Sequence, residues 1–169
     1  SDVPREILRR VAARDPRIRF IERTGNGGIS AASNDAVEAA RGEFLALLDH
    51  DDLLLPHALA SMAAAIEADP SADYLYSDED KIDDRGRIFA AFRKPDWSPE
   101  RFRHQMYTCH LSVLRTALVR SVGGFRLGYD GSQDHDLVLR VTEQARSVVH
   151  VPEILYHWRI IPGSAAGDV

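Results

Sequence analysis

The sequence has 169 residues, 44% of them hydrophobic and 28% charged, which is an ordinary composition for a single globular domain. Its formal net charge of −5 excludes the basic field that would hold a nucleic-acid backbone or an anionic bilayer by charge alone. The single cysteine, Cys109, excludes an intrachain disulfide and is expected to be a packing residue, and no stretch approaches the ~20 apolar residues that span a bilayer.

Helices and strands are expected to alternate through the first half of the chain. The expected elements are helices over 4–14 and 30–40, a helix opening at Pro56, and strands over 17–22, 44–48 and 74–76. The run from Phe44 to Leu48 is apolar without a break, as in strands buried on both faces of a parallel sheet. The alternation predicts an α/β fold with a mostly parallel sheet flanked by helices, whose ligand lies beyond the carboxyl ends of the strands.

The second half of the chain is less regular. Its expected elements are a turn over 83–86, a strand over 109–114, a helix over 134–144 and two short strands over 148–151 and 154–158. The sequence contains no internal repeat and no clear linker, so residues 1–169 are expected to form one domain.

The carboxylates that follow the apolar run at 44–48 are the strongest local signal. Asp49, Asp51 and Asp52 would be delivered together to the ligand edge of the sheet. Three close charges repel one another unless a hard divalent cation binds there, and Mg²⁺ or Mn²⁺ takes oxygen ligands of this kind. The alternative interpretation is a solvated acidic turn.

A second acidic cluster, over 132–136, follows the glycine-rich loop 123–131 and opens a helix. Glycines let a substrate approach the backbone closely, which favours a chemical role for Asp134. The alternative is that Asp134 only caps the helix. Asp136 is assigned to helix-dipole or structural duty.

The third feature is the segment 156–159 at the end of the last expected strand. Strand alternation points His157 and Arg159 the same way, so an imidazole and a guanidinium could reach one site that holds a metal and a phosphate. The alternative is an ordinary half-buried histidine.

Seven segments together resemble family 2 glycosyltransferases, with bacterial enzymes of O-antigen, capsule and cell-surface polysaccharide synthesis as the nearest kin. The segments are 28–34 (Gly-Ile-Ser-Ala-Ala-Ser-Asn), 48–52 (Leu-Asp-His-Asp-Asp), 76–80 (Tyr-Ser-Asp-Glu-Asp), 94–99 (Lys-Pro-Asp-Trp-Ser-Pro), 123–126 (Gly-Gly-Phe-Arg), 133–137 (Gln-Asp-His-Asp-Leu) and 156–159 (Tyr-His-Trp-Arg). Each motif is weak alone, but their order and spacing across nearly the whole chain are specific. The resemblance implies a GT-A fold, which is the Rossmann-like fold of nucleotide-diphospho-sugar transferases.

The resemblance also implies roles for individual residues. Asp51 would hold the divalent metal on the donor diphosphate, and Asp49 would contact the ribose or assist the metal. Asp134 matches the general base that deprotonates the acceptor hydroxyl. The remaining matches are His157 as a further metal ligand, Asn34 and Arg159 as donor-binding residues, and Asp78, Glu79 and Trp97 as residues of the sugar and acceptor pocket.

The implied activity is hexosyltransferase-like: metal-dependent, inverting transfer from a nucleotide-diphosphate sugar to a carbohydrate or lipid-linked glycan acceptor, with Mn²⁺ or Mg²⁺ as cofactor. The chemistry agrees, because a sugar hydroxyl needs a positioned base and a leaving diphosphate is stabilised by a cation. The expected location is the cytoplasm at the inner face of the membrane, with any peripheral attachment made through regions outside this chain.

One departure from the family pattern concerns the start of the chain. Family members normally begin with an apolar strand and a second strand that ends in an acidic turn, and these bind the base of the nucleotide. The sequence opens instead on a helical pattern at Pro4, after a pair, Ser1 and Asp2, that resembles the residues just after the second strand. This chain alone is therefore expected to bind the donor weakly or not at all.

Three other interpretations remain. A phosphatase of the haloacid dehalogenase type also carries Asp-x-Asp after an apolar strand, but it usually has threonine or valine where this chain has Leu53. A calcium-binding module over 77–86 fails the EF-hand spacing. A catalytically degenerate glycosyltransferase domain, kept for binding or assembly, is disfavoured by the retained Asp51, Asp134 and His157.

Overall fold

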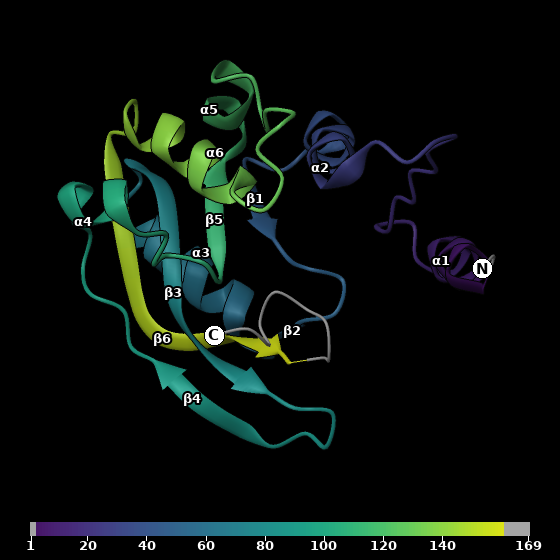
Figure 1. Ribbon diagram of the computed structural model, residues 1–169, viewed down its shortest axis with the longest axis horizontal. Coiled ribbons are helices and arrows are strands. Elements are labelled where there is room, and N and C mark those ends of the chain that lie inside the picture. The colour runs from purple at the N-terminus through teal and green to yellow at the C-terminus, as the bar shows by residue number, and fades with distance from the viewer. Residues whose placement is uncertain (1–2, 161–169) are drawn as a thin grey trace.

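The computed structural model describes residues 3–160 and has the α/β architecture predicted from the sequence (Figure 1). The helices are α1 (Val3–Arg14), α2 (Gly28–Ala39), α3 (Ala58–Ala68), α4 (Pro99–His104), α5 (Thr116–Ser121) and α6 (Gln133–Thr142). The strands are β1 (Phe44–Leu47), β2 (Leu53–Leu54), β3 (Ala72–Ile82), β4 (Ile88–Phe92), β5 (Ser112–Arg115) and β6 (Ser147–Arg159).

The strand directions correct one part of the sequence prediction. The order in the sheet is β1-β5-β3-β6-β2, with β4 also paired to β3. Within residues 3–160 only the β3–β6 pairing is parallel, and the other four pairings are antiparallel. The expectation of a mostly parallel sheet was therefore wrong. Strands β1, β3 and β6 do share one direction, but β5 lies between β1 and β3 and runs against both.

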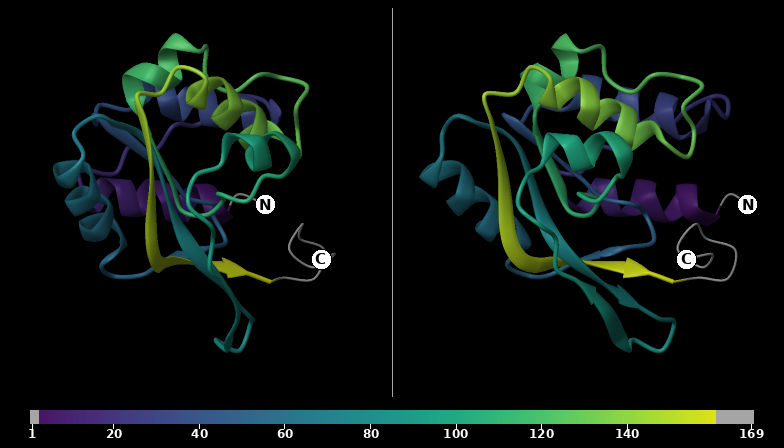
Figure 2. Two further views of the ribbon diagram at one scale, coloured as in Figure 1. Left: turned by 90° about the vertical axis from the view of Figure 1, so that its left-hand side faces the viewer. Right: turned by 60° about the vertical axis from the view of Figure 1, so that its left-hand side comes forward.

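The sheet carries helices on both faces, and the two faces have separate hydrophobic cores (Figure 2). Side chains alternate along β3 because successive residues of a strand point to opposite faces. Tyr74 and Tyr76 pack toward the helices α2, α4, α5 and α6, whereas Leu75 packs toward Ala58 and Met62 of α3. Strand β3 is buried along almost its whole length, which makes it the rigid centre of the fold.

Four predicted strands differ in the structure. Residues 17–22 form no strand, and Ile18 and Ile21 stay largely exposed because no neighbouring strand pairs with this segment within the described part of the chain. Strand β1 is at the end of the sheet path and is only partly buried, not buried on both faces. The two short strands predicted over 148–158 are one continuous strand, β6, with a shift of register against β3 near Val151.

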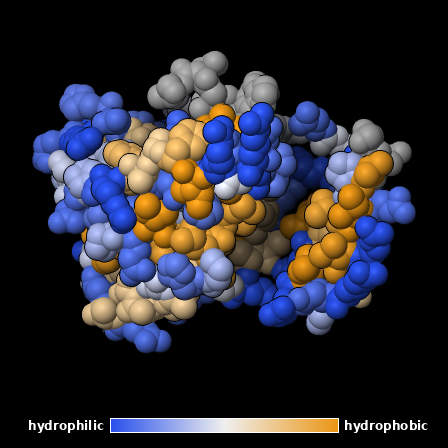
Figure 3. Space-filling view, turned by 90° about the horizontal axis from the view of Figure 1, so that it is seen from below, coloured by the Kyte–Doolittle hydropathy of each residue, from blue (hydrophilic) through white to orange (hydrophobic). Residues whose placement is uncertain are grey.

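Helix α1 has an apolar face that no other described element covers. Val3, Ile7, Leu8 and Val11 are all more than 40% exposed, and no residue of the helix is buried. Figure 3 shows the corresponding apolar stripe on the right of the molecule, where α1 lies in Figure 1. None of the helices within residues 3–160 is long and apolar enough to cross a membrane.

Candidate active site

The acidic loop after β1 is fixed to strand β6 by its last aspartate. The buried carboxylate of Asp52 accepts hydrogen bonds from the Tyr156 hydroxyl and, at 2.8 Å, from the backbone N–H of Arg159. Burial raises the pKa of Asp52 despite these two hydrogen bonds. The Arg159 side chain donates at 2.6 Å to the backbone carbonyl of Asp51. Asp52 thus anchors the loop, and Asp49 and Asp51 are left to line the cleft described below.

The glycine-rich loop before α6 is held by Asn34 of α2. The Asn34 amide donates to the carbonyl of Phe125 at 2.7 Å and accepts from the N–H of Phe125 at 2.8 Å. Gly124 has φ +66°, and a Cβ there would lie 2.5 Å from the Asn34 oxygen. Only glycine fits a positive φ with a side-chain oxygen this close. Asn34 therefore positions the loop, and its predicted contact with the donor stays a prediction.

Asp134 sits in the first turn of α6 and is oriented by its neighbour Gln133. The Gln133 side chain is buried, accepts from the N–H of Gly131 at 2.7 Å and donates to the Asp134 carboxylate at 3.0 Å. Burial raises the pKa of Asp134, and the charge of Asp49 acts in the same direction, while His110 and Gln133 lower it. A carboxylate with a raised pKa and a fixed orientation is suited to accept a proton. Asp136, two residues on, is instead paired with Arg126 and Arg140, in agreement with its predicted structural duty.

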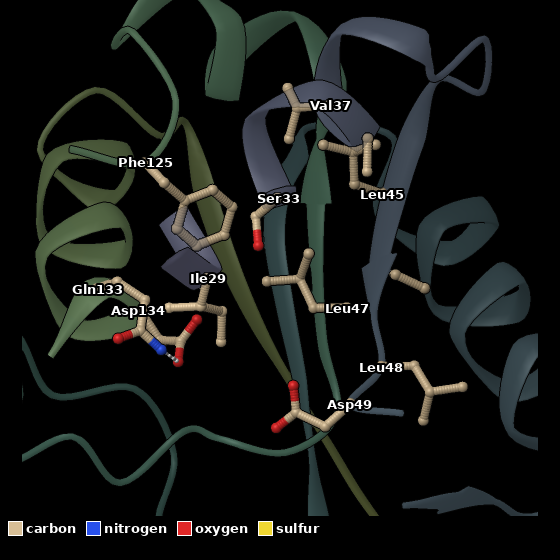
Figure 4. Close-up of a pocket in the computed structure, with 12 residues that line it drawn as sticks. Ile29, Ser33, Val37, Leu45, Leu47, Leu48, Asp49, Phe125, Gln133 and Asp134 are labelled. Atoms are coloured by element: carbon tan, nitrogen blue, oxygen red, sulfur yellow. Dashed lines mark hydrogen bonds between the residues drawn. The ribbon is translucent and has the colours of Figure 1, made fainter. Parts of the chain in front are cut away.

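The two acidic motifs open into one cleft of about 640 Å³. Asp49 and Asp51 line it from the loop after β1, Asp134 lines it from α6, and Glu79 lines it from β3. A smaller neighbouring pocket of about 230 Å³ is also lined by Asp49 and Asp134, which lie on opposite sides of it in Figure 4. The apolar wall of the larger cleft includes Phe92, Met106 and Trp158.

His157 and Arg159 end β6 as predicted but have partners of their own. Nδ1 of His157 pairs with the buried carboxylate of Asp80 on β3. The Arg159 side chain is engaged by the backbone of Asp51, as described above. Their predicted roles at a metal and a phosphate stay predictions.

The three residues predicted to shape the sugar pocket lie in different surroundings. Asp78 is buried and accepts hydrogen bonds from Arg93, from the N–H of Lys94 and from His150. Burial by itself would raise the pKa of Asp78, but these hydrogen bonds together lower it. Glu79 reaches the cleft. Trp97 packs in an aromatic cluster with Tyr74, Phe102 and Tyr107. Among these three, Glu79 alone lines the large cleft.

Sequence inspection missed His110, Gln133 and Lys94. His110 lies in the cleft, 3.7 Å from Asp49 and 3.4 Å from Glu79, with its ring stacked on Tyr156. Lys94 has a fully buried side chain, and its ammonium lies 3.3 Å from Glu79. The one sequence signal for a role of Gln133 was its position directly before Asp134. Lys94 was noted only as the first residue of the 94–99 motif, and His110 had no local signal, because the fold brings both to Glu79 from segments distant in the sequence.

The residues of the cleft fit a hard divalent cation. Four carboxylates line it, those of Asp49, Asp51, Glu79 and Asp134. Its basic residues are Lys81 and His110, together with His135 of α6. Asp49, Asp52 and His110 each offer one ligand atom, and these atoms lie within 4.8 Å of one another. Oxygen and imidazole nitrogen ligands of this kind suit Mn²⁺, and the oxygen ligands also suit Mg²⁺.

Comparison with known proteins identifies the family to which the chain belongs. Residues 1–122 match the family model described as glycosyl transferase family 2. The chain therefore belongs to glycosyl transferase family 2, as the sequence motifs predicted. It is 49% identical over 164 residues to an uncharacterized protein, y4gI, of Sinorhizobium fredii, which covers 96% of this chain and 18% of that protein. It is 45% identical over 160 residues to the O-antigen biosynthesis protein RfbC of Myxococcus xanthus, which covers 95% of this chain and 12% of that protein. The chain thus spans less than a fifth of the length of these relatives.

Solved structures confirm the predicted GT-A fold. The S. aureus protein TarS, residues 1–349, matches with a TM-score of 0.70 at 20% identity, over 89% of this chain and 47% of that one. The mannosyltransferase PcManGT of Pyrobaculum calidifontis, solved in complex with GDP-Man and Mn²⁺, matches with a TM-score of 0.67 at 18% identity, over 93% of this chain and 44% of that one.

Proposed function

We propose that this chain is the catalytic part of a metal-dependent, inverting glycosyltransferase. The donor is a nucleotide-diphosphate sugar, and the acceptor is a carbohydrate or lipid-linked glycan in cell-surface polysaccharide synthesis. The family membership and the O-antigen relative support this class of reaction. The observation that carries the proposal is that Asp134 and the carboxylates after β1 line the same cleft.

In this reaction Asp134 is the general base. It takes the proton of the acceptor hydroxyl while that oxygen attacks the anomeric carbon, and the bond between the anomeric carbon and the diphosphate oxygen breaks on the opposite face. The configuration at the anomeric carbon is therefore inverted. Gln133 holds the carboxylate in place, and the burial of Asp134 brings its pKa closer to neutral pH. A base of this kind contributes about 10²–10⁴-fold to the rate.

Asp49 and Asp51 are the carboxylates that bind the cation and the donor. A bound Mn²⁺ or Mg²⁺ would stabilise the negative charge that gathers on the leaving nucleoside diphosphate. The S. aureus and Pyrobaculum calidifontis proteins, solved with UDP-GlcNAc and with GDP-Man and Mn²⁺, support a donor of this class. The apolar wall formed by Phe92, Met106 and Trp158 suits the carbon face of a sugar ring, with the carboxylates fixing its orientation.

The test is a screen of UDP- and GDP-sugars with the complete protein that contains this chain. We expect nucleoside diphosphate release from one donor in Mn²⁺, loss of release in EDTA, and an inverted anomeric centre in the product by NMR. No release from any donor would contradict the proposal and favour a degenerate binding domain. Hydrolysis of a chromogenic phosphate ester in place of sugar transfer would favour the phosphatase alternative.

A further inference from the structure

Lys94 carries a buried charge behind the wall of the cleft, and the sequence motifs assign it no role. We propose that Lys94 is a positioning residue. Its ammonium fixes Glu79 so that the free oxygen of this carboxylate accepts a hydrogen bond from a hydroxyl of the donor sugar. The inference rests on the sugar transfer in the proposed function, and it adds a residue that does not itself line the cleft.

The ammonium of Lys94 has a partner for each of its three N–H donors. It lies 3.3 Å from Oε2 of Glu79, and it donates to the backbone carbonyls of Thr108 at 3.4 Å and His110 at 2.5 Å. The side chain is fully buried, so these contacts replace water. Because a lysine ammonium has three donors and no acceptor, its hydrogen bonding is complete within the protein. Lys94 is therefore not itself free to bind a ligand.

The backbone of Lys94 is fixed as well as its side chain. Its N–H donates at 2.9 Å to Asp78, the residue next to Glu79 on β3. Asp78 is buried and also accepts from Arg93 and from His150 of β6. Burial lowers the pKa of Lys94, and the charge of Glu79 opposes that effect. Strand β3 thus holds the lysine at both ends, and Glu79 favours its charged form.

The contacts of Glu79 are confined to one of its two oxygens. Oε2 accepts from the ammonium of Lys94 and from the backbone N–H of His110, and it faces Nδ1 of the His110 ring at 3.4 Å. No hydrogen bond within residues 3–160 reaches Oε1, although Glu79 lines the cleft. An ionised carboxylate has about four acceptor sites, so Oε1 is a fixed acceptor that a ligand can use.

The place of Glu79 in the cleft favours the donor sugar as this ligand. The His110 ring lies 3.4 Å from Glu79 and 3.7 Å from Asp49, so Glu79 is close to the loop that is proposed to bind the donor. Phe92 of the apolar wall is directly opposite Glu79 in the pairing of β3 with β4. An apolar wall beside a charged acceptor suits a sugar ring, which has both a carbon face and hydroxyl donors.

The inference is tested by the kinetics of the complete protein with the nucleotide sugar that is active in the screen above. Lys94→Met has a similar length and no ammonium, so the KM for the nucleotide sugar should rise about tenfold or more. The Kd of UDP or GDP alone, measured by calorimetry with Mn²⁺, should not change because these ligands have no sugar. Arg85→Met, which removes an exposed cation from the turn between β3 and β4, is the control and should change neither value.

A double variant distinguishes positioning from a purely structural role. Lys94→Met leaves a buried carboxylate without its cation and should lower the melting temperature. Removing both charges in Glu79→Gln/Lys94→Met should raise the melting temperature again, because no unpaired charge is then buried. The KM for the nucleotide sugar should stay high, since a neutral amide without the ammonium is a weaker and less fixed acceptor. The double variant also gives the answer if Lys94→Met does not fold.

Three results would overturn the inference. A wild-type KM for the nucleotide sugar in folded Lys94→Met or in the double variant would reduce Lys94 to a structural residue and leave the proposed function intact. An equal rise in the Kd of UDP or GDP would show that the effect is not specific to the sugar. Absence of nucleoside diphosphate release by the wild type from every sugar would remove the proposed function and this inference with it.

Discussion

The aspartates of the acidic loop after β1 have different roles because their surroundings differ. Asp52 is buried and bonded to β6, so it holds the loop, whereas Asp49 and Asp51 remain in the cleft. Asp134 comes from a helix more than eighty residues later in the chain and is buried at the edge of the same cleft. These contacts distinguish Asp52, which anchors the loop, from Asp49, Asp51 and Asp134, which line the cleft.

Replacing the proposed base tests its role at the level of one atom. Asp134→Asn keeps the shape of the side chain but cannot accept the proton, so kcat should fall by about 10²–10⁴-fold with little change in donor affinity. Initial rates and calorimetric donor titration of the complete protein measure the two effects. Asp84→Asn, in the exposed turn between β3 and β4, is the matched control and should leave both unchanged. Transfer at the wild-type rate in Asp134→Asn would remove Asp134 from this role.

The raised pKa of Asp134 also predicts a cost in stability at neutral pH. Burial raises its pKa in the folded state above the ordinary Asp value of about 3.9, so the folded protein loses stability as pH rises from that value through the raised pKa. Asp134→Asn has no charge to bury and should melt at a higher temperature than the wild type at pH 7. The difference should shrink toward zero below about pH 3.9, where the wild-type carboxyl is neutral in both states. Thermal melts in EDTA across this pH range measure it, and an unchanged or lower melting temperature at pH 7 would contradict the account.

The sequence could predict the acidic residues of the site but not the histidine. Asp49, Asp51 and Asp134 stand at element ends, beside an apolar run or a glycine-rich loop, and the structure does bring them together. His110 lies in a segment with no such local signal. Its meeting with Glu79 and Asp49 depends on which strands pair, which is a long-range property of the fold.

At the scale of elements, the clamp between α2 and the loop before α6 sets the position of Asp134. Asn34 is bonded to both the N–H and the carbonyl of Phe125, so α2 determines where the glycine-rich loop runs. This clamp explains the Gly-Gly-Phe motif in physical terms, because the second glycine must leave room for the Asn34 oxygen.

Substitutions at two adjacent glycines distinguish the steric clash of an added Cβ with Asn34 from the backbone strain of a positive φ. Gly123 and Gly124 both have a positive φ, but a Cβ at Gly123 would meet nothing within 4 Å, whereas one at Gly124 would lie 2.5 Å from Asn34. Gly123→Ala should cost about 1 kcal/mol in free energy of unfolding from backbone strain. Gly124→Ala should cost about 1–3 kcal/mol more, because the clamp must break. Urea denaturation of both variants measures the difference, and equal costs would show that the clamp contributes nothing.

Most helices were predictable from apolar spacing, but the order of the strands was not. Helices α1, α2, α3 and α6 lie within a few residues of their predicted ranges. The parallel sheet was inferred from alternation of helices and strands, which fixes the common direction of β1 and β3 without showing that β5 lies between them. The segment 17–22 has an alternating pattern and still forms no strand, because a strand needs a partner.

At the scale of the whole molecule, the chain combines a rigid sheet with a first segment that makes few buried contacts. Strand β3 is buried and paired on both sides, while α1 has no buried residue. In hydrogen exchange of a chain of this sequence, amides of 4–26 should exchange within seconds, and those of 73–78 should be the slowest. Slow exchange in α1 comparable with β3 would show that its apolar face is covered.

The account as a whole depends on one acidic cleft that serves both the cation and the base. The most direct measurement is an anomalous difference map from crystals of the complete protein grown with Mn²⁺ and a nucleoside diphosphate. The account predicts a single strong peak at the carboxylates after β1, with the Asp134 side chain opening into the same cavity. An ion bound elsewhere, or an Asp134 carboxylate turned to a separate surface, would contradict it.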